Sequence, residues 1–277
     1  MNISTGSCFL FFLGGMASAS SAFAAECVPA VPDSELIEPG KLIMSINPTL
    51  PPLQYVDQTG EVQGMRVELG KKIAERLCLS PEYIRIEFSA MVPGLQVGRW
   101  DMINTGIFFT EDRTKIMQMI PYEQQAISIS VANTSAQTIT SADDLDGKVV
   151  GVEIGGFEEN KARQFNEDLK ARGRSGFELR TFDSFALAYQ ALRAGQVDAV
   201  ASIDGVAKEY ATRGNFLQAV SGLYPTPVAL AFRSKPLAEA VAKAINEMKA
   251  DGEYQKLFDE FGAKPSQGAA IVAGPDN

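Results

Sequence analysis

The sequence predicts an α/β protein of two lobes, each a mainly parallel sheet flanked by helices. Apolar, strand-like segments alternate along the chain with amphipathic, helix-like segments, which is the pattern of parallel strands joined by crossover helices. The alternation occurs in two separate series. A chain of 277 residues is also large for a single hydrophobic core.

The first series begins with a strand, and a helix with one buried stripe follows it. Leu69, Ile73 and Leu77 recur at the i, i+4, i+8 spacing of that stripe. The other segments of this series are a strand at 42–46, a strand at 83–88, a short helix at 89–98 and a strand-like segment at 100–103.

The second series repeats the pattern farther along the chain. We expect Asp183 to cap its second helix, in which Phe185, Tyr189 and Leu192 are apolar. The other segments of this series are a strand at 149–154, a charged helix at 158–172, a strand at 177–182 and a strand at 197–203.

Two apolar, strand-like runs, at 126–132 and 228–232, fall outside both series. Helices at 237–248 and 253–261 follow the second run. The segment 263–277 contains Pro, Gly and small residues without periodicity, and we expect it to be a flexible tail.

The N-terminal segment 1–25 is expected to be a secretory signal peptide, cleaved near Ala24 or Ala25. It contains no charged side chain, and its apolar run at 9–16 is too short to span a bilayer. The segment also lacks the usual Lys or Arg near its start, and the alternative is a buried apolar helix. Cys8 has no lipoprotein-type context. We therefore expect a soluble, periplasmic protein without a lipid anchor.

The composition argues against several classes of function. The net charge of −9 disfavours nucleic acid and anionic membrane surfaces as partners. The absence of histidine removes His-based triads, most transition-metal sites and the usual general base. Three cysteines without C-x-x-C spacing make no zinc site. We expect neither a metal nor a cofactor.

Two cysteines, Cys27 and Cys78, remain once the signal peptide is removed. In an oxidising compartment such a pair is typically a disulfide. The alternative is two free thiols, one of them buried in a helix.

The segment 104–113 is the most informative part of the chain. Thr110 followed by Glu111 and Asp112 indicates a helix start, with a hydroxyl cap and acids that suit the positive end of the helix dipole. Arg113 then lies in the first turn, where a cation costs roughly 0.3–1 kcal/mol. Either Arg113 forms a local ion pair with one of these acids, or its guanidinium binds an anion such as a carboxylate bidentately.

This segment resembles the signature G-x-[ST]-x-T-x-x-R of the amino-acid-binding periplasmic solute-binding proteins (solute-binding family 3). Gly106, Thr110 and Arg113 match it, whereas Phe108 replaces a hydroxyl residue that many members carry. The resemblance implies that Arg113 clamps the α-carboxylate of a ligand and that the carbonyl of Gly106 accepts from its α-amine.

The resemblance extends from about residue 41 to 262 through five further ordered matches. These are found at 51–55, 64–69, 92–95, 144–150 and 195–200. It implies the type II periplasmic-binding-protein fold, with the two apolar runs as crossover strands between the lobes. Lobe 1 would be discontinuous. The implied ranges are 41–122 and 229–262 for lobe 1, 128–222 for lobe 2, and 263–277 for the tail.

Further site residues are implied at the carboxyl ends of the lobe 1 strands, where ligands of open α/β sheets bind. Asn47 matches a family position that often holds an acid for the ligand amine, although it could equally be a turn residue before Pro48. Phe88 is either a wall of the ligand site or part of the core.

On lobe 2, the segment 153–158 follows a strand and opens a helix whose amides, near Gly156 and Phe157, can bind the ligand carboxylate. Members of the family typically carry Ser or Thr here, so the carboxylate would depend more on Arg113. Glu153 lies where members read the ligand side chain. The alternative for Glu153 is a solvated acid at the end of a strand.

Asp204 is implied to bind the α-amine, as an acid does at this place in the family. It comes one residue later than the usual spacing, so the alternative is that Ile203 takes the ligand-facing place.

The sequence therefore predicts a monomeric periplasmic receptor that delivers an amino acid or a derivative to the membrane permease subunits of an ABC importer. Phe88, Phe108 and Phe157 beside Glu153 favour a cationic or N-substituted ligand, held in part by cation–π contact, although these rings could also line an apolar slot or the core. A betaine-like or opine-like solute is a further alternative.

Two other classes of function are alternatives. One is a cleft enzyme of the prephenate/arogenate dehydratase type that uses Glu153. The other is a sensory domain of a receptor or transglycosylase, which the absence of a transmembrane or catalytic extension disfavours.

Overall fold

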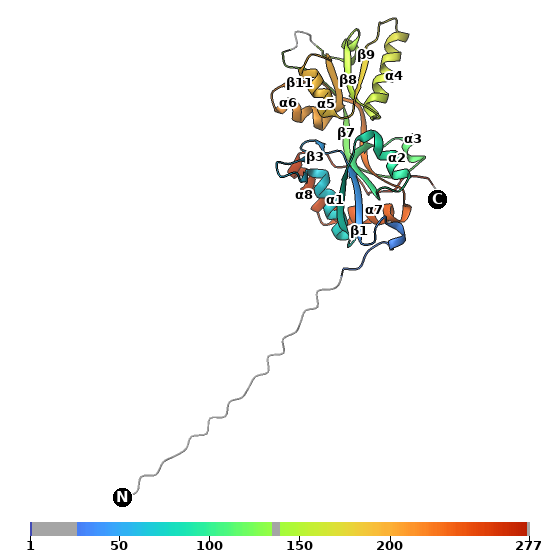
Figure 1. Ribbon diagram of the computed structural model, residues 1–277, viewed down its shortest axis with the longest axis vertical. Helices are drawn as coiled ribbons and strands as arrows, with labels where there is room; N and C mark the ends of the chain where they lie inside the picture. The colour runs from blue at the N-terminus through green and yellow to red at the C-terminus, as the bar shows by residue number, and fades with distance from the viewer. Residues whose placement is uncertain (2–26, 135–138, 276–277) are drawn as a thin grey trace.

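The computed structural model describes residues 1, 27–134 and 139–275 and has two lobes joined by β7 and β11 (Figure 1). Apart from Met1, the expected signal peptide lies outside the described residues. No helix in the described part of the chain is long and apolar enough to cross a membrane.

One eight-stranded sheet runs through both lobes in the order β5-β1-β6-β11-β7-β10-β8-β9. Its central strands, β7 (Gln118–Ala132) and β11 (Phe216–Phe232), pair antiparallel along most of their length. Both are longer than the apolar runs at 126–132 and 228–232, because their ends in each lobe are polar or mixed. The remaining neighbours within each lobe are parallel, apart from the pairs β6–β11 and β7–β10.

The lower lobe in Figure 1 holds the first series of elements and the two C-terminal helices. Its strands are β1 (Lys41–Ile46), β5 (Ser80–Arg85) and β6 (Met102–Phe108), with a small separate sheet of β2 (Thr49–Leu50), β3 (Gln54–Val56) and β4 (Val62–Gln63). Its helices are α1 (Met65–Arg76), α2 (Met91–Gln96), α3 (Glu111–Thr114), α7 (Lys235–Ala250) and α8 (Glu253–Phe261), with 3₁₀ turns η1 (Asp33–Glu35) and η2 (Phe88–Ala90).

The upper lobe holds the second series. Its elements are β8 (Val149–Glu153), β9 (Glu178–Phe182), β10 (Ala199–Ile203), α4 (Phe157–Ala171), α5 (Phe185–Arg193), α6 (Asp204–Thr212) and the 3₁₀ turn η3 (Ala142–Leu145). Helix α6 was not expected. Helix α5 is capped by Ser184, whose side chain accepts from the Leu187 N–H, and not by Asp183.

Two boundaries in the lower lobe differ from expectation and affect the site. Strand β6 continues to Phe108, so Gly106 lies inside a strand and not in a loop after it. Strand β5 ends at Arg85, so Phe88 stands in the turn η2 that leads into α2. The expected stripe on α1 is buried, with Leu69, Ile73 and Leu77 at most 2 % exposed.

The C-terminal segment differs from the expected flexible tail. Backbone bonds join Met119 to Ala273 in both directions, and the Ser266 N–H donates to the Tyr122 carbonyl at 2.9 Å. The segment therefore lies along the edge of β7 that no strand of the lower lobe covers, and supplies partners for its backbone groups.

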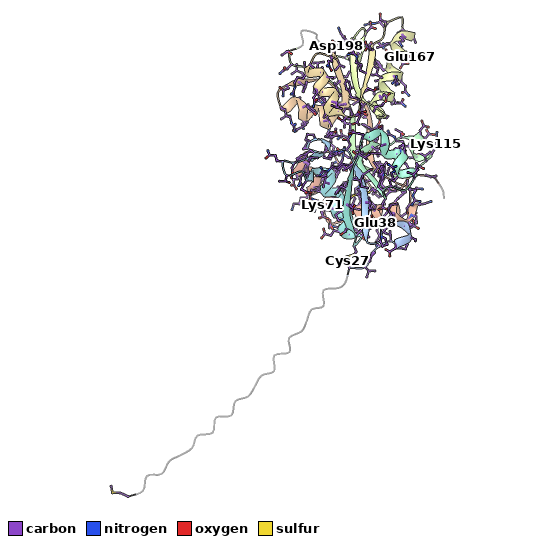
Figure 2. All side chains as sticks on the ribbon, in the orientation of Figure 1. Cys27, Glu38, Lys71, Lys115, Glu167 and Asp198 are labelled. Carbon is purple, nitrogen blue, oxygen red and sulfur yellow. A yellow bond between two sulfur atoms is a disulfide. The ribbon has the colours of Figure 1, made fainter. Side chains whose placement is uncertain are left out.

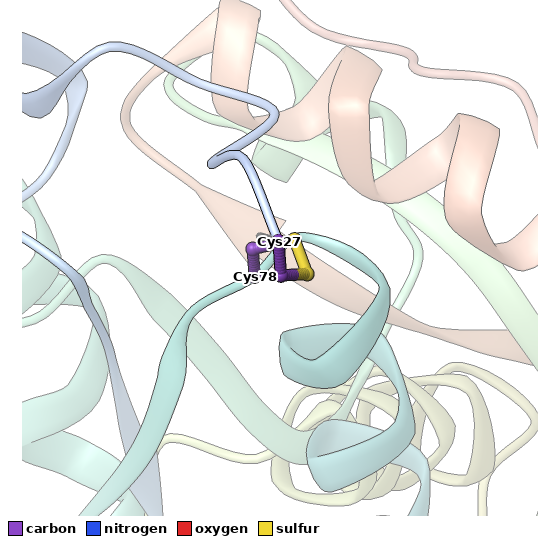
Figure 3. Close-up of a disulfide and its surroundings, with 2 residues drawn as sticks. All are labelled: Cys27 and Cys78. Atoms are coloured by element: carbon purple, nitrogen blue, oxygen red, sulfur yellow. A yellow bond between two sulfur atoms is a disulfide. The ribbon is translucent and has the colours of Figure 1, made fainter. Parts of the chain in front are cut away.

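The disulfide between Cys27 and Cys78 is confirmed (Figure 3). It ties the start of the described chain to the turn after α1, with a Cα–Cα distance of 5.5 Å and a sequence separation of 51. The alternative of two free thiols is thereby set aside.

Candidate functional site

Side chains from both lobes meet around one small cavity at the waist of the molecule. The cavity measures about 10 Å³, room for about one water molecule. It is lined by Asn47, Leu50, Phe88, Thr105, Gly106, Phe108, Glu153, Phe157, Glu158, Phe185 and Ile203. The structure thus brings together six of the residues expected at the site: Asn47, Phe88, Gly106, Phe108, Glu153 and Phe157.

Asn47 links the two lobes across this cavity. It follows β1 and is 3 % exposed, and its backbone N–H donates to the Thr105 hydroxyl at 3.1 Å. Its side-chain Nδ2 donates to Glu153 Oε1 at 3.1 Å. Asn47 is therefore more than a turn residue, because its side chain makes a buried hydrogen bond from lobe to lobe.

Position 106 requires a glycine because the side chain of a buried arginine leaves no room for a Cβ there. Its φ is +80°, and a Cβ at this position would lie 2.1 Å from Cζ of Arg66. The Arg66 guanidinium donates to the Thr105 carbonyl at 2.6 Å and to Glu123 at 3.0 Å, and the side chains of Arg66 and Glu123 are both fully buried. This pair was not foreseen, although Arg66 stands three residues before Leu69 on the apolar stripe of α1, where a charge needs a partner.

Arg113 does not form the local ion pair considered above. Lys115 pairs with both acids of the turn, at 2.8 Å from Asp112 and 3.8 Å from Glu111. Among the described residues Arg113 pairs with no carboxylate. Its Nη1 donates to the Phe108 carbonyl at 2.8 Å, and its Cζ lies 5.7 Å from the centroid of the Phe88 ring.

The charge of Arg113 is poorly compensated in its surroundings. Burial lowers the pKa of Arg113 to about 10, and the nearby charge of Glu158 opposes that shift. Arg113 does not itself line the cavity but contacts Phe88 and Phe108, which do. Thr110 also lies outside the cavity and caps α3, accepting from the Arg113 N–H at 3.3 Å.

Glu153, on the lobe 2 side, is a buried acid and not a solvated one. It is 4 % exposed at the end of β8. Burial raises the pKa of Glu153 well above its ordinary value, the charges of Glu158 and Glu87 add to the shift, and the Phe185 N–H opposes it. A cation placed in the cavity would restore the charged form of this acid.

Aromatic rings close the cleft. Phe108 of β6 and Phe157 of α4 stack with their centroids 4.5 Å apart and their planes at 29°. Phe88 and Phe185 also line the cavity. Because the stacked pair joins the two lobes, any separation of the lobes at this point has to part these rings.

Glu158 is a cavity residue that the sequence did not single out. It is 2 % exposed, and its Oε1 has no hydrogen-bond partner among the described residues. Burial raises the pKa of Glu158 to about 7, against the effect of its own backbone N–H and of the charges of Arg113 and Arg66. Sequence alone could not distinguish it from Glu159, because both read as acids that suit the start of a helix.

Two further expected residues, besides Thr110 and Arg113, lie outside the cavity. Gly156 is the N-cap residue of α4. Asp204 begins α6 and accepts from the Ser128 hydroxyl and from the Gly222 N–H. It lines a separate cavity of about 520 Å³ beside β7 and β11. Ile203, the alternative considered above, lines the small cavity between the lobes.

Comparison with known proteins finds the same family that the sequence motifs resemble. The model of the bacterial extracellular solute-binding proteins, family 3, matches residues 42–264. The L-cystine-binding protein TcyJ of Escherichia coli K12 is 30% identical over 232 residues, which cover 82% of this chain and 84% of that protein.

Two solved structures resemble this one closely. An ancestral arginine-binding protein bound to arginine superposes with a TM-score of 0.74 and 31% identity, over 80% of this chain and 98% of the other. The ancestral amino acid-binding protein AncCDT-1, described as a precursor of cyclohexadienyl dehydratase, gives a TM-score of 0.72 and 27% identity, over 80% of this chain and 95% of the other.

We predict that Gly106→Ala destabilises the protein more than Gly60→Ala does. Both glycines have a positive φ, but a Cβ at Gly60 has nothing within 4 Å, whereas at Gly106 it meets the Arg66 guanidinium. The control should cost about 1 kcal/mol for the backbone conformation alone, and Gly106→Ala roughly 2 kcal/mol more from overpacking. Chemical denaturation measures the free energy of unfolding of both variants. Equal decreases would show that the Arg66 side chain can move aside without destabilising the protein.

Proposed function

Because the chain belongs to the bacterial extracellular solute-binding proteins, family 3, we propose that it is the periplasmic receptor of an ABC importer. It binds an amino acid or an amino-acid derivative between its lobes and presents the closed complex to the membrane permease subunits, acting as a monomer. The observation that carries this proposal is the buried cavity where charged and polar groups of both lobes converge.

The anionic end of the ligand is assigned to lobe 1. Arg113 is a partly buried cation without a carboxylate partner among the described residues, and its Phe108 carbonyl contact leaves most of its donors for another acceptor. A guanidinium has five N–H donors in a planar fork that matches a carboxylate. The ligand therefore carries a carboxylate.

The cationic end of the ligand is assigned to lobe 2. Glu153 is buried in the cavity wall, and its hydrogen bond from Asn47 leaves acceptor sites on the carboxylate unused. A cationic nitrogen on the ligand would offset the desolvation of this acid. The rings of Phe108 and Phe157 add faces that favour a cation by roughly 0.5–2 kcal/mol.

Opening of the cleft is attributed to the two crossover strands. The pairing of β7 and β11 shifts register four times between Gln218 and Ala229. Pro225 and Pro227 in this stretch offer no N–H to the ladder. A ladder interrupted in this way bends more readily than a regular one, so the lobes can rotate about it, part the Phe108–Phe157 stack and close again around the ligand.

A second candidate, a cleft enzyme of the prephenate/arogenate dehydratase type, is favoured by one observation. The pKa of Glu158 is raised by burial to about 7, close to the working pH of a general acid. Turnover of prephenate or arogenate by the purified protein, lost in Glu158→Gln, would support the enzyme. Stoichiometric binding without product supports the receptor.

We predict that Arg113→Ala lowers ligand affinity at least about 100-fold, the loss of a buried charged hydrogen-bond pair, while the unfolding midpoint changes little. Arg113→Lys should recover only part of the affinity, because the bidentate fork is lost. Lys115→Ala is the matched control, since Lys115 is exposed beyond the end of α3 (Figure 2). Titration calorimetry decides, and an affinity for Arg113→Ala within a few-fold of wild type would refute the clamp.

We further predict the ranking of ligands in a thermal-shift panel of arginine, lysine, glycine betaine, leucine and glutamate. Arginine and lysine, whose side chains carry a cation, should stabilise most, by roughly 2.7 kcal/mol at a hundredfold excess over Kd. Glutamate should be rejected, because its side-chain carboxylate would face Glu153 in a desolvated site. Glu153→Gln should weaken the cationic ligands and leave leucine unchanged. Tight binding of glutamate would contradict the assignment. So would an affinity for leucine that is higher than for the other ligands and is unchanged in Glu153→Gln.

A further inference from the structure

Glu158 is a buried acid in the cavity wall that has no part in the contacts proposed above for Arg113 and Glu153. Its carboxyl lines the cavity between the lobes, and Oε1 lacks a hydrogen-bond partner among the described residues. The other oxygen lies over Gly156, where a Cβ would be 2.7 Å from Oε2. A buried carboxylate oxygen without a donor is destabilising, so the position calls for an explanation.

Stabilisation of the helix dipole does not provide that explanation. Glu159 already serves the start of α4, because its carboxylate accepts from the Gly155 N–H at 2.7 Å. The Gly156 N–H is bonded to the Glu153 carbonyl at 3.4 Å. The Gly156 amide, one of those expected to bind the ligand carboxylate, is thus occupied by the chain itself. On lobe 2, Glu158 offers a ligand an acceptor.

The acid that was expected to accept from the ligand α-amine lies elsewhere. Asp204 accepts from Ser128 and Gly222 outside the cavity, and apolar Ile203 takes the place in the cavity wall. A zwitterionic amino acid would therefore bring an ammonium group into the cleft without a partner from β10 or α6. The carbonyl of Gly106, a residue that also lines the cavity, brings no charge, and an ammonium without a charged partner in a closed site is destabilised.

Glu158 is placed to supply the missing partner. Glu153 already accepts from Asn47 Nδ2, whereas Oε1 of Glu158 has no donor among the described residues. The charge of Arg113 also acts on Glu158. In an amino acid the ammonium group is on the carbon next to the carboxylate, so Glu158 is the acid that faces the α-ammonium when Arg113 holds the carboxylate, and Glu153 is left for the side chain.

We propose that Glu158 accepts hydrogen bonds from the α-ammonium group of the ligand, in place of Asp204. This assignment rests on the proposed receptor function. Together with Glu153 it makes a site of two acids and one guanidinium, which is complementary to an amino acid with one carboxylate and two cationic nitrogens. Ligands without an α-N–H donor, including quaternary betaines, are then bound more weakly than primary amines of the same shape.

The test compares each amino acid with an analogue that lacks only the α-amine. The pairs are arginine and 5-guanidinopentanoate, lysine and 6-aminohexanoate, and leucine and 4-methylpentanoate. Calorimetry on the full-length protein gives the affinity ratio within each pair for wild type, Glu158→Gln, Asp204→Asn and Glu167→Gln. Glu167 is the matched control on α4, with an exposed side chain far from the waist (Figure 2). Unfolding midpoints verify that each variant is folded.

For the tightest pair, wild type should prefer the amine-bearing ligand by roughly tenfold to a hundredfold, as for a buried hydrogen bond between charged groups. Glu158→Gln should reduce that ratio to within a few-fold of unity, and both other variants should retain it. The assignment is overturned if Glu158→Gln leaves the ratio unchanged, if it weakens both members of a pair equally, if Asp204→Asn collapses the ratio, or if no member of any pair binds.

This failure is distinct from failure of the receptor function. If Arg113→Ala abolishes binding but Glu158→Gln leaves the affinity ratio within each pair unchanged, only the assignment of Glu158 is refuted. Binding that is indifferent to Arg113→Ala refutes the carboxylate clamp on which the proposed function depends.

Discussion

The buried ion pair between Arg66 and Glu123 is the constraint on which the geometry of the cleft depends. Both side chains are fully buried, and removing either would leave an unpaired charge at a cost of about 3–5 kcal/mol. The Arg66 guanidinium fixes the strand segment around Gly106 through the Thr105 carbonyl. Gln54 joins the same network and donates to the Asn47 carbonyl at 3.0 Å. Since Glu123 lies on β7, one pair positions the edge of lobe 1 that lines the cavity and anchors it to a crossover strand.

The basic and acidic side chains proposed to contact the ligand lie on different lobes. Lobe 1 contributes a guanidinium, Arg113, and lobe 2 contributes the acids Glu153 and Glu158, all in surroundings that shift their pKa toward the neutral form. Such groups favour the closed state only when a ligand of complementary charge lies between them. The aromatic stack and the Asn47–Glu153 bond join the lobes. In the proposed receptor, the charged groups on the two lobes couple ligand binding to closure.

Much of the fold could be predicted from the sequence, because apolar periodicity and capping residues such as Thr110 are local signals. The alternation of strands and helices followed from them, whereas the crossover strands were implied by the family resemblance and the disulfide by a cysteine pair in an oxidising compartment. The one-residue ambiguity between Ile203 and Asp204 could not be resolved, since the direction of each side chain depends on where β10 ends and α6 begins. The Arg66–Glu123 pair was missed because its members are 57 residues apart. Only burial in the cavity wall distinguishes Glu158 from Glu159, and burial is a tertiary property.

The most direct test of this account is a crystal structure of the wild-type protein with the tightest ligand found in the thermal-shift panel. We expect the ligand carboxylate to lie on the Arg113 guanidinium and its cationic nitrogens to lie within hydrogen-bond distance of Glu153 and Glu158. The ligand should also separate the rings of Phe108 and Phe157. A ligand bound in the opposite sense, with its carboxylate toward lobe 2 and Arg113 still bonded only to the Phe108 carbonyl, would contradict this account.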